Sequence, residues 1–236
     1  MDNINTWLPF ASAVISLVFA ALVLKRYVLR KRPCFLLWGL GMAFYALGGF
    51  CEAFYGAFGW HSVIFRLWYL FGAILVAAWL GQGTVYLLVS RRWAHGLMVL
   101  LALASAYAAM RVFAAELDPS RLTQSVHTGS ELSGHAIVTP GVRLLTPFFN
   151  LYGTVALIGG ALWSAFLFWR KRILLHRTVG NILIALGALS PALGGTFSRL
   201  GLANMLYLGE LLGAILMFAG FIRATTPMRG NQLDNV

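Results

Sequence analysis

The chain has 236 residues, of which 60% are hydrophobic and 11% are charged. A soluble domain carries about 25% charged residues, so this composition excludes an ordinary soluble protein and indicates an integral membrane protein. The formal net charge is +11. Nucleic-acid binding is not expected from that charge, because the basic residues stand in short clusters beside apolar runs, which is the pattern of membrane orientation.

Apolar runs long enough to cross a bilayer occur along the whole chain. A helix of about 18 or more apolar residues spans the hydrocarbon core, and the runs between polar breaks predict an all-α, single-domain bundle of seven transmembrane helices. The first run does not look like a cleaved signal peptide, because Asp2 follows Met1 in place of a basic segment. The expected helices are about 6–27, 34–58, 62–89, 93–115, 140–169, 178–201 and 204–222, with an outer loop at 116–139 and one domain over 1–236.

Four polar breaks carry most of the positive charge. They read KRYVLRKR, SRRWAH, RKRILLHR and IRATTPMRG, and they hold 13 of the 18 Lys and Arg residues. The positive-inside rule therefore predicts these breaks in the cytoplasm, with the N-terminus outside and the C-terminus cytoplasmic. The simplest location is a bacterial inner membrane. In the outer loop, Thr139 and Pro140 are expected to serve as the N-cap and first position of the fifth helix.

Small residues recur at helical spacing near the C-terminal end. Gly180, Gly187, Gly194 and Gly201 leave one stripe of the sixth helix without side chains, so another helix can approach it closely. Gly209 and Gly213 give the seventh helix a similar face. Packing inside the bundle is the favoured interpretation, and association with a second copy or a partner membrane protein is the alternative. The prolines within the fifth and sixth helices, Pro147 and Pro191, permit kinks.

Charged residues are expected to form a layer near the outer end of the bundle. Arg66 lies within a predicted span, and a guanidinium there must reach the membrane interface or contact a partner. Glu210 is expected to pair with Arg66 or Arg111, because its short acidic side chain is not attracted to lipid phosphates. If they face inward, the arginines could hold an anionic group. The candidate ligand-binding residues are Glu52, Arg66, Arg111, Arg143, Arg199 and Glu210, with Asn150 deeper in the fifth helix.

Several kinds of cofactor site are not expected. The lysines, Lys25, Lys31 and Lys171, stand at cytoplasmic ends, which excludes a covalent retinal Schiff base. No histidine stands at mid-span to ligate haem. His127, Glu131 and His135 have the spacing of a helical metal site, but the glycines among them disfavour a helix. Two cysteines, Cys34 and Cys51, are seventeen residues apart on one expected helix and therefore cannot form a disulfide.

The leading functional hypothesis is a non-enzymatic membrane protein. It would bind a small anionic ligand or lipid near the outer face, or act as a subunit of a larger membrane complex. A channel or transporter with a central polar path is the alternative. An intramembrane lipid-modifying enzyme ranks third: it needs a reactive pair at one depth, and the candidate group of Glu52, Glu210 and His61 matches no catalytic spacing. Expected partners are membrane lipids, a second copy, or another membrane protein.

Overall fold

The computed structural model describes residues 3–59, 61–122, 134–170, 175–200, 202 and 205–225. Within this part of the chain, seven helical stretches are long and apolar enough to cross a membrane, which confirms the predicted all-helical class. Every predicted helix boundary lies within three residues of an observed one. The spans are α1 (Asn3–Arg30), α2 (Pro33–Phe58), α3–η1–α4 (Ser62–Leu67, Trp68–Leu75, Val76–Leu88), α5 (Arg91–Ala114), α6–η5–α7 (Val142–Thr154, Val155–Gly159, Gly160–Arg170), α8 (Leu175–Arg199) and α9 (Met205–Thr225).

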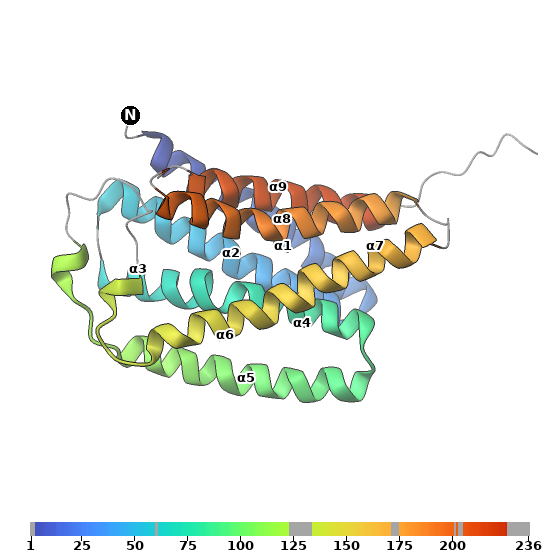
Figure 1. Ribbon diagram of the computed structural model, residues 1–236, viewed down its shortest axis with the longest axis horizontal. Helices are drawn as coiled ribbons and strands as arrows, with labels where there is room; N and C mark the ends of the chain where they lie inside the picture. The colour runs from blue at the N-terminus through green and yellow to red at the C-terminus, as the bar shows by residue number, and fades with distance from the viewer. Residues whose placement is uncertain are drawn as a thin grey trace, which may run out of the picture.

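Six of these spans form a closed ring and the seventh lies outside it. In the ring α1 packs on α2 and α9, α9 packs on α8, α8 on α7, η5 on α4, and α4 on α2. Among the described residues, the span α5 has its main contacts with η1, α4 and α6, and Figure 1 shows it along one edge of the bundle. Its exposed side chains include Leu100, Leu103 and Phe113. This apolar surface suits contact with lipid.

The two ends of the bundle differ in charge and in the length of their connections. We call the end where α1 stops, α2 starts and α4 meets α5 the basic end, since Arg30, Lys31, Arg91 and Arg92 are exposed there. The opposite end is the loop end, where α3 begins and the connection between α5 and α6 lies (Figure 1). All seven spans therefore run between a basic end and a loop end.

Residues with restricted or unusual backbone geometry set the helix ends. Pro33 starts α2 after Arg32 in extended backbone, where the absent N–H of proline costs no hydrogen bond. Gly59 ends α2 with φ of 80°, a value that favours glycine. The expected cap at Thr139 is wrong: α6 begins at Val142 after Gly141 (φ 81°), and the Thr139 hydroxyl instead accepts the Glu116 N–H at 2.8 Å.

The predicted glycine stripe lies at the contact between α8 and α9. A Cβ added at Gly180 would lie 2.7 Å from the Gly220 carbonyl oxygen, and one at Gly187 would lie 2.9 Å from that of Gly213. Gly194 faces Gly209 in the same way. The backbones of α8 and α9 are thus in direct contact, so these glycines serve helix packing within the chain. Gly201 lies outside the described residues.

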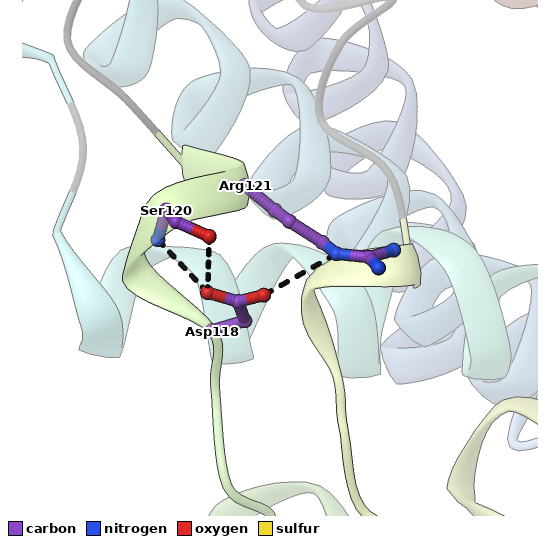
Figure 2. A network of polar contacts seen from close by, with 3 residues as sticks. All are labelled: Asp118, Ser120 and Arg121. Atoms are coloured by element: carbon purple, nitrogen blue, oxygen red, sulfur yellow. Dashed lines mark hydrogen bonds and ion pairs between the residues drawn. The ribbon is translucent and has the colours of Figure 1, made fainter.

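The connection at the loop end is held by a small polar network around Asp118, shown in Figure 2. Ser120 donates its N–H and its hydroxyl to Asp118 Oδ1 at 3.0 and 2.6 Å, and Arg121 Nε lies 3.3 Å from Oδ2. Asp118 N–H donates to the Ala136 carbonyl, which ties the short helix η2 (Pro119–Leu122) to η4 (Gly134–Ala136). The hydrogen bonds from Ser120 are the main cause of a lowered Asp118 pKa, with a smaller contribution from Arg121.

Candidate functional site

Two glutamates from opposite ends of the sequence meet inside the bundle. Glu52 on α2 and Glu210 on α9 have their carboxyl groups side by side, close enough to interact directly. Glu52 lies six residues before the end of α2 and Glu210 five residues after the start of α9. At about 1.5 Å per residue, both are therefore roughly 8 to 9 Å from the helix ends at the loop end. We call Glu52 and Glu210 the acidic pair.

The two members of the acidic pair differ in exposure and in partners. Glu52 is only 3% exposed, whereas Glu210 is partly exposed. Trp68, the first residue of η1, donates its indole N–H to Glu52 Oε1 at 2.7 Å. The other oxygen, Oε2, is buried and has no hydrogen-bond partner. A buried carboxyl oxygen without a donor from the chain costs free energy, so binding of a proton or a positively charged group to this atom is favoured.

Hydroxyl groups surround the acidic pair on the side of α1 and α2. Tyr45 lies seven residues before Glu52, on the same face of α2. Its hydroxyl donates to the backbone carbonyl oxygen of Glu210 at 2.9 Å. The Ser12 hydroxyl lies next to that of Tyr45 without the geometry of a regular hydrogen bond. Ser12 and Ser16, one turn apart on α1, are 1% and 0% exposed and their oxygens have no partner. The Tyr45 hydroxyl, with Ser12 beside it, is therefore the hydroxyl group that lies near the acidic pair.

Two adjacent glycines bring the neighbouring helices close to Glu52. A Cβ at Gly48 would lie 3.0 Å from Gly72 Cα of η1, and a Cβ at Gly49 would lie 3.0 Å from the Pro9 carbonyl oxygen of α1. Side chains at these positions would push η1 and α1 away from α2. The GlyGly step thus places Trp68 and the α1 hydroxyls beside a carboxyl group only one turn further along α2.

An apolar cluster separates the acidic pair from the basic end. It consists of Phe19, Val23, Met42, Met217 and Phe221, all less than 10% exposed. Met217 lies seven residues beyond Glu210 on α9, or about 10 Å along the helix. The polar groups around Glu52 therefore do not continue along this face of the bundle to its basic end.

Arg66, a candidate for the anion site, instead binds the end of another helix. Its guanidinium donates to the carbonyl oxygens of Val112, Phe113 and Ala115 at 2.5, 2.8 and 2.9 Å. The last carbonyls of a helix have no partner within it and carry partial negative charge, so a cation at the end of α5 satisfies both needs. The expected pairing of Glu210 with Arg66 or Arg111 is therefore wrong: Glu210 contacts Glu52 instead.

The other candidate arginines also lie apart from the acidic pair. Arg111 donates to the Pro140 carbonyl at 2.9 Å, and Arg143, which is exposed, contacts His135 Nε2 at 3.2 Å. The side chain of Arg199 lies outside the described residues. Within the described part of the chain, the arginines bind carbonyls or a loop residue at the loop end and do not surround a common space with the glutamates.

Asn150, expected deeper in the fifth helix, and the polar residues Gln82 and Tyr152 connect η1, α4, α5 and α6. Asn150 donates to the Ala73 carbonyl of η1 at 3.1 Å. Gln82, which is 0% exposed, donates to the Ala94 carbonyl at 2.8 Å and accepts a short hydrogen bond from Tyr152. Each of these groups is satisfied by a neighbouring span, which is the role of most buried amides in helix bundles. They link helices and do not extend the acidic pair.

The remaining candidate groups give no second site among the described residues. Cys34 and Cys51 are both buried and free, in agreement with the prediction that they do not bridge. Of the suggested loop metal ligands, His135 contacts Arg143, while His127 and Glu131 lie outside the described residues.

Sequence reasoning identified both glutamates but missed the residues around them. Trp68 carried no signal, because tryptophan is common near membrane interfaces. The spacing of seven between Tyr45 and Glu52 and of four between Ser12 and Ser16 would have placed each pair on one helix face. Neither spacing says which neighbouring helix that face meets.

Comparisons with known proteins do not assign this chain to a family. No protein-family model, no curated protein and no solved structure matches the chain significantly. The inferred function therefore rests on the geometry of the acidic pair and its neighbours.

Proposed function

We propose that this protein is a non-enzymatic, multi-pass membrane protein that binds a small cationic species at the acidic pair. The observation that supports this most directly is the contact between Glu52 and Glu210 within the membrane-spanning bundle. Two carboxyl groups that share one buried place attract a positive charge, because they otherwise repel each other and lose the hydration they have in water. The ligand has the opposite sign to the one expected from the arginines.

The surroundings of the pair support a binding site. Glu52 Oε2 and the Ser12 hydroxyl are buried acceptors without a regular partner, and both suit a ligand that carries positive charge or a proton. Glu210 is a residue of intermediate exposure, whereas Glu52 is buried, so the pair lies close to the surface of the bundle only on the side of α9. No basic side chain in the described part of the chain neutralises the pair.

Binding is favoured over conduction because of the apolar cluster below the acidic pair. Phe19, Met42 and Met217 fill the space between α1, α2 and α9 on the side of the basic end. An ion crossing the bundle along this route would lose its polar contacts over about 10 Å, at a cost of several kcal/mol. We therefore expect no steady ion flux through the purified protein in liposomes.

A ligand-dependent thermal shift tests the proposal. The purified full-length chain is melted with sodium, calcium or tetramethylammonium chloride at constant ionic strength, and separately across a pH series. We expect at least one of these cations, the proton included, to shift the midpoint of wild type by more than that of Glu52→Gln or Glu210→Gln. Glu116→Gln is the matched control, since Glu116 is exposed at the loop end. Equal responses from wild type and both amide variants would refute the proposal.

Binding of an anionic lipid head group at the loop end is the second candidate. Arg143 and His135 are exposed and in contact there, and a guanidinium at the membrane surface suits a lipid phosphate. Lipid bound to the purified protein is measured by native mass spectrometry, which detects protein–lipid adducts directly. We expect Arg143→Gln to lose phosphatidylglycerol adducts relative to Arg121→Gln, and unchanged adducts would exclude this site.

We propose further that the basic end faces the cytoplasm of a bacterial inner membrane. The exposed Arg30, Lys31, Arg91 and Arg92 support this by the positive-inside rule. Both native cysteines are buried, so single cysteines introduced at Ser120 and Arg92 can be labelled selectively in whole cells. We expect an impermeant thiol reagent to label the Ser120→Cys variant and not Arg92→Cys; the reverse pattern would invert the orientation.

A further inference from the structure

We infer that the cationic species is a proton, held between the Glu52 and Glu210 carboxyl groups. This inference rests on the proposed function and specifies its ligand. The proton adds to one carboxylate oxygen and no other bond breaks. The protonated carboxyl then donates its O–H to the neighbouring carboxylate, so the pair carries one negative charge in place of two.

The unpartnered oxygen of Glu52 is the first argument for a shared proton. Glu52 Oε1 already accepts the Trp68 N–H, Oε2 is buried with no donor, and the carboxyl group as a whole interacts with that of Glu210. If Glu210 carries the shared proton, Glu52 Oε2 can accept a hydrogen bond from it. If Glu52 Oε2 carries the proton, this oxygen becomes the donor. Adjacent carboxyl groups in other proteins hold one proton for the same reason, since both cannot ionise at close range in a medium of low dielectric constant.

The small number of oxygen ligands is the second argument. Sites for calcium or magnesium supply about six or more oxygen ligands, some of them from water. Among the described residues, the oxygen-bearing side chains at this place are the two carboxyl groups and the Tyr45 and Ser12 hydroxyls. The Trp68 N–H points its positive end at Glu52, which disfavours a metal cation there. Among the described residues, no three His, Cys, Asp or Glu side chains are arranged so that they could hold a metal ion. A proton needs only the two oxygens that are present.

The groups that face the pair do not supply a competing charge. On α2 the titratable neighbours are Tyr45 and Cys51, on α1 the neighbour is Ser12, and on η1 it is Trp68. None of these carries charge near neutral pH. Proton uptake by the pair therefore changes the local charge without compensation from another described side chain.

Proton binding also has a mechanical consequence. Glu52 belongs to α2 and Glu210 to α9, and Tyr45 connects the same two helices through the Glu210 carbonyl. With a shared proton the carboxyls attract each other, and without it they repel. We therefore expect proton loss to weaken the side-chain contact of Glu210 on α9 with Glu52 on α2.

Infrared difference spectroscopy on the full-length chain in lipid nanodiscs tests the inference. Spectra at acidic and alkaline pH are subtracted, and the C=O stretch of a protonated carboxyl is followed. We expect a pH-dependent band from a buried carboxyl in wild type and in Glu116→Gln, and its loss in Glu52→Gln and Glu210→Gln. Glutamine at position 52 can still accept from Trp68 and can donate to Glu210, so we expect that variant to fold.

Different outcomes separate the inference from the proposed function. If the band is absent, or is insensitive to both amide substitutions, while sodium, calcium or tetramethylammonium shifts the melting of wild type alone, the ligand is another cation and the proton inference is overturned. If neither protons nor these cations give a response that depends on Glu52 and Glu210, both proposals fail. A band that titrates with pH and is unaffected by the added cations supports both.

Discussion

Trp68 donates its indole N–H to the carboxyl of Glu52 at 2.7 Å, and this bond joins the first residue of a π-helical segment to the buried member of the acidic pair. π-Helical turns often occur at functional sites because the extra residue changes which side chains face inward. The close approach of Gly72 in η1 to Gly48 in α2 accompanies this arrangement. The position of the indole thus depends on both the helix type and the glycine contact.

Phenylalanine at position 68 keeps an aromatic ring but removes the indole N–H. In Trp68→Phe, Glu52 loses its donor, and we expect a loss of about 1–3 kcal/mol of stability from the unpaired carboxyl oxygen. The measurement is thermal or denaturant unfolding in detergent. Trp79→Phe is the control, because Trp79 donates to the neutral Ser105 hydroxyl at 3.2 Å. A larger loss for the control than for Trp68→Phe would contradict the importance of the Glu52 bond.

The crossing of α4 and α6 depends on Gly153. A Cβ there would lie 2.2 Å from the Ala77 carbonyl carbon, so Gly153→Ala must push the two backbones apart. We expect a destabilisation of about 1–3 kcal/mol, as for overpacked cores. At Gly159, on the same span, a Cβ would meet nothing within 4 Å. Gly159→Ala should therefore unfold like wild type, and equal effects of the two substitutions would refute the close crossing.

Arg66 is expected to stabilise the C-terminal end of α5. Lysine keeps the charge but lacks the planar fork that reaches the carbonyls of Val112, Phe113 and Ala115 together. We expect Arg66→Lys to cost about 1–2 kcal/mol and to speed hydrogen exchange in the last turn of α5. Arg143→Lys, at an exposed position, is the control. Unchanged exchange in Arg66→Lys would show that the guanidinium is not needed there.

Acid should loosen the short helix η2. Hydrogen bonds from Ser120 lower the pKa of Asp118 below the value of about 3.9 for an unfolded chain. Its contribution to stability is therefore complete above that value and is lost as the pH falls through the lowered pKa. Hydrogen exchange of the Ser120 amide, corrected for its intrinsic rate, should speed up in acid in wild type. Asp118→Asn should show no such change, and a matching acid response in that variant would exclude Asp118 as the cause.

The sequence alone was sufficient for the seven spans and their bounds. In a bilayer every backbone polar group must be satisfied within its own span, so long apolar runs have no alternative to helix. Hydropathy carried this information directly, and the polar breaks marked where each helix ends. The glycine spacing of α8 likewise predicted a close helix contact, which the structure assigns to α9.

Only the tertiary structure decided which charged groups meet. Glu52, Arg66 and Glu210 stand at similar depth, and depth is all that their positions within the spans determine. Which of them contact each other depends on how each helix is rotated about its axis and on which helix is its neighbour. Those are set by contacts such as Gly48 with Gly72 and Gly49 with Pro9. The arginine consequently binds the end of α5, and Glu210, expected to pair with an arginine, pairs with Glu52 instead.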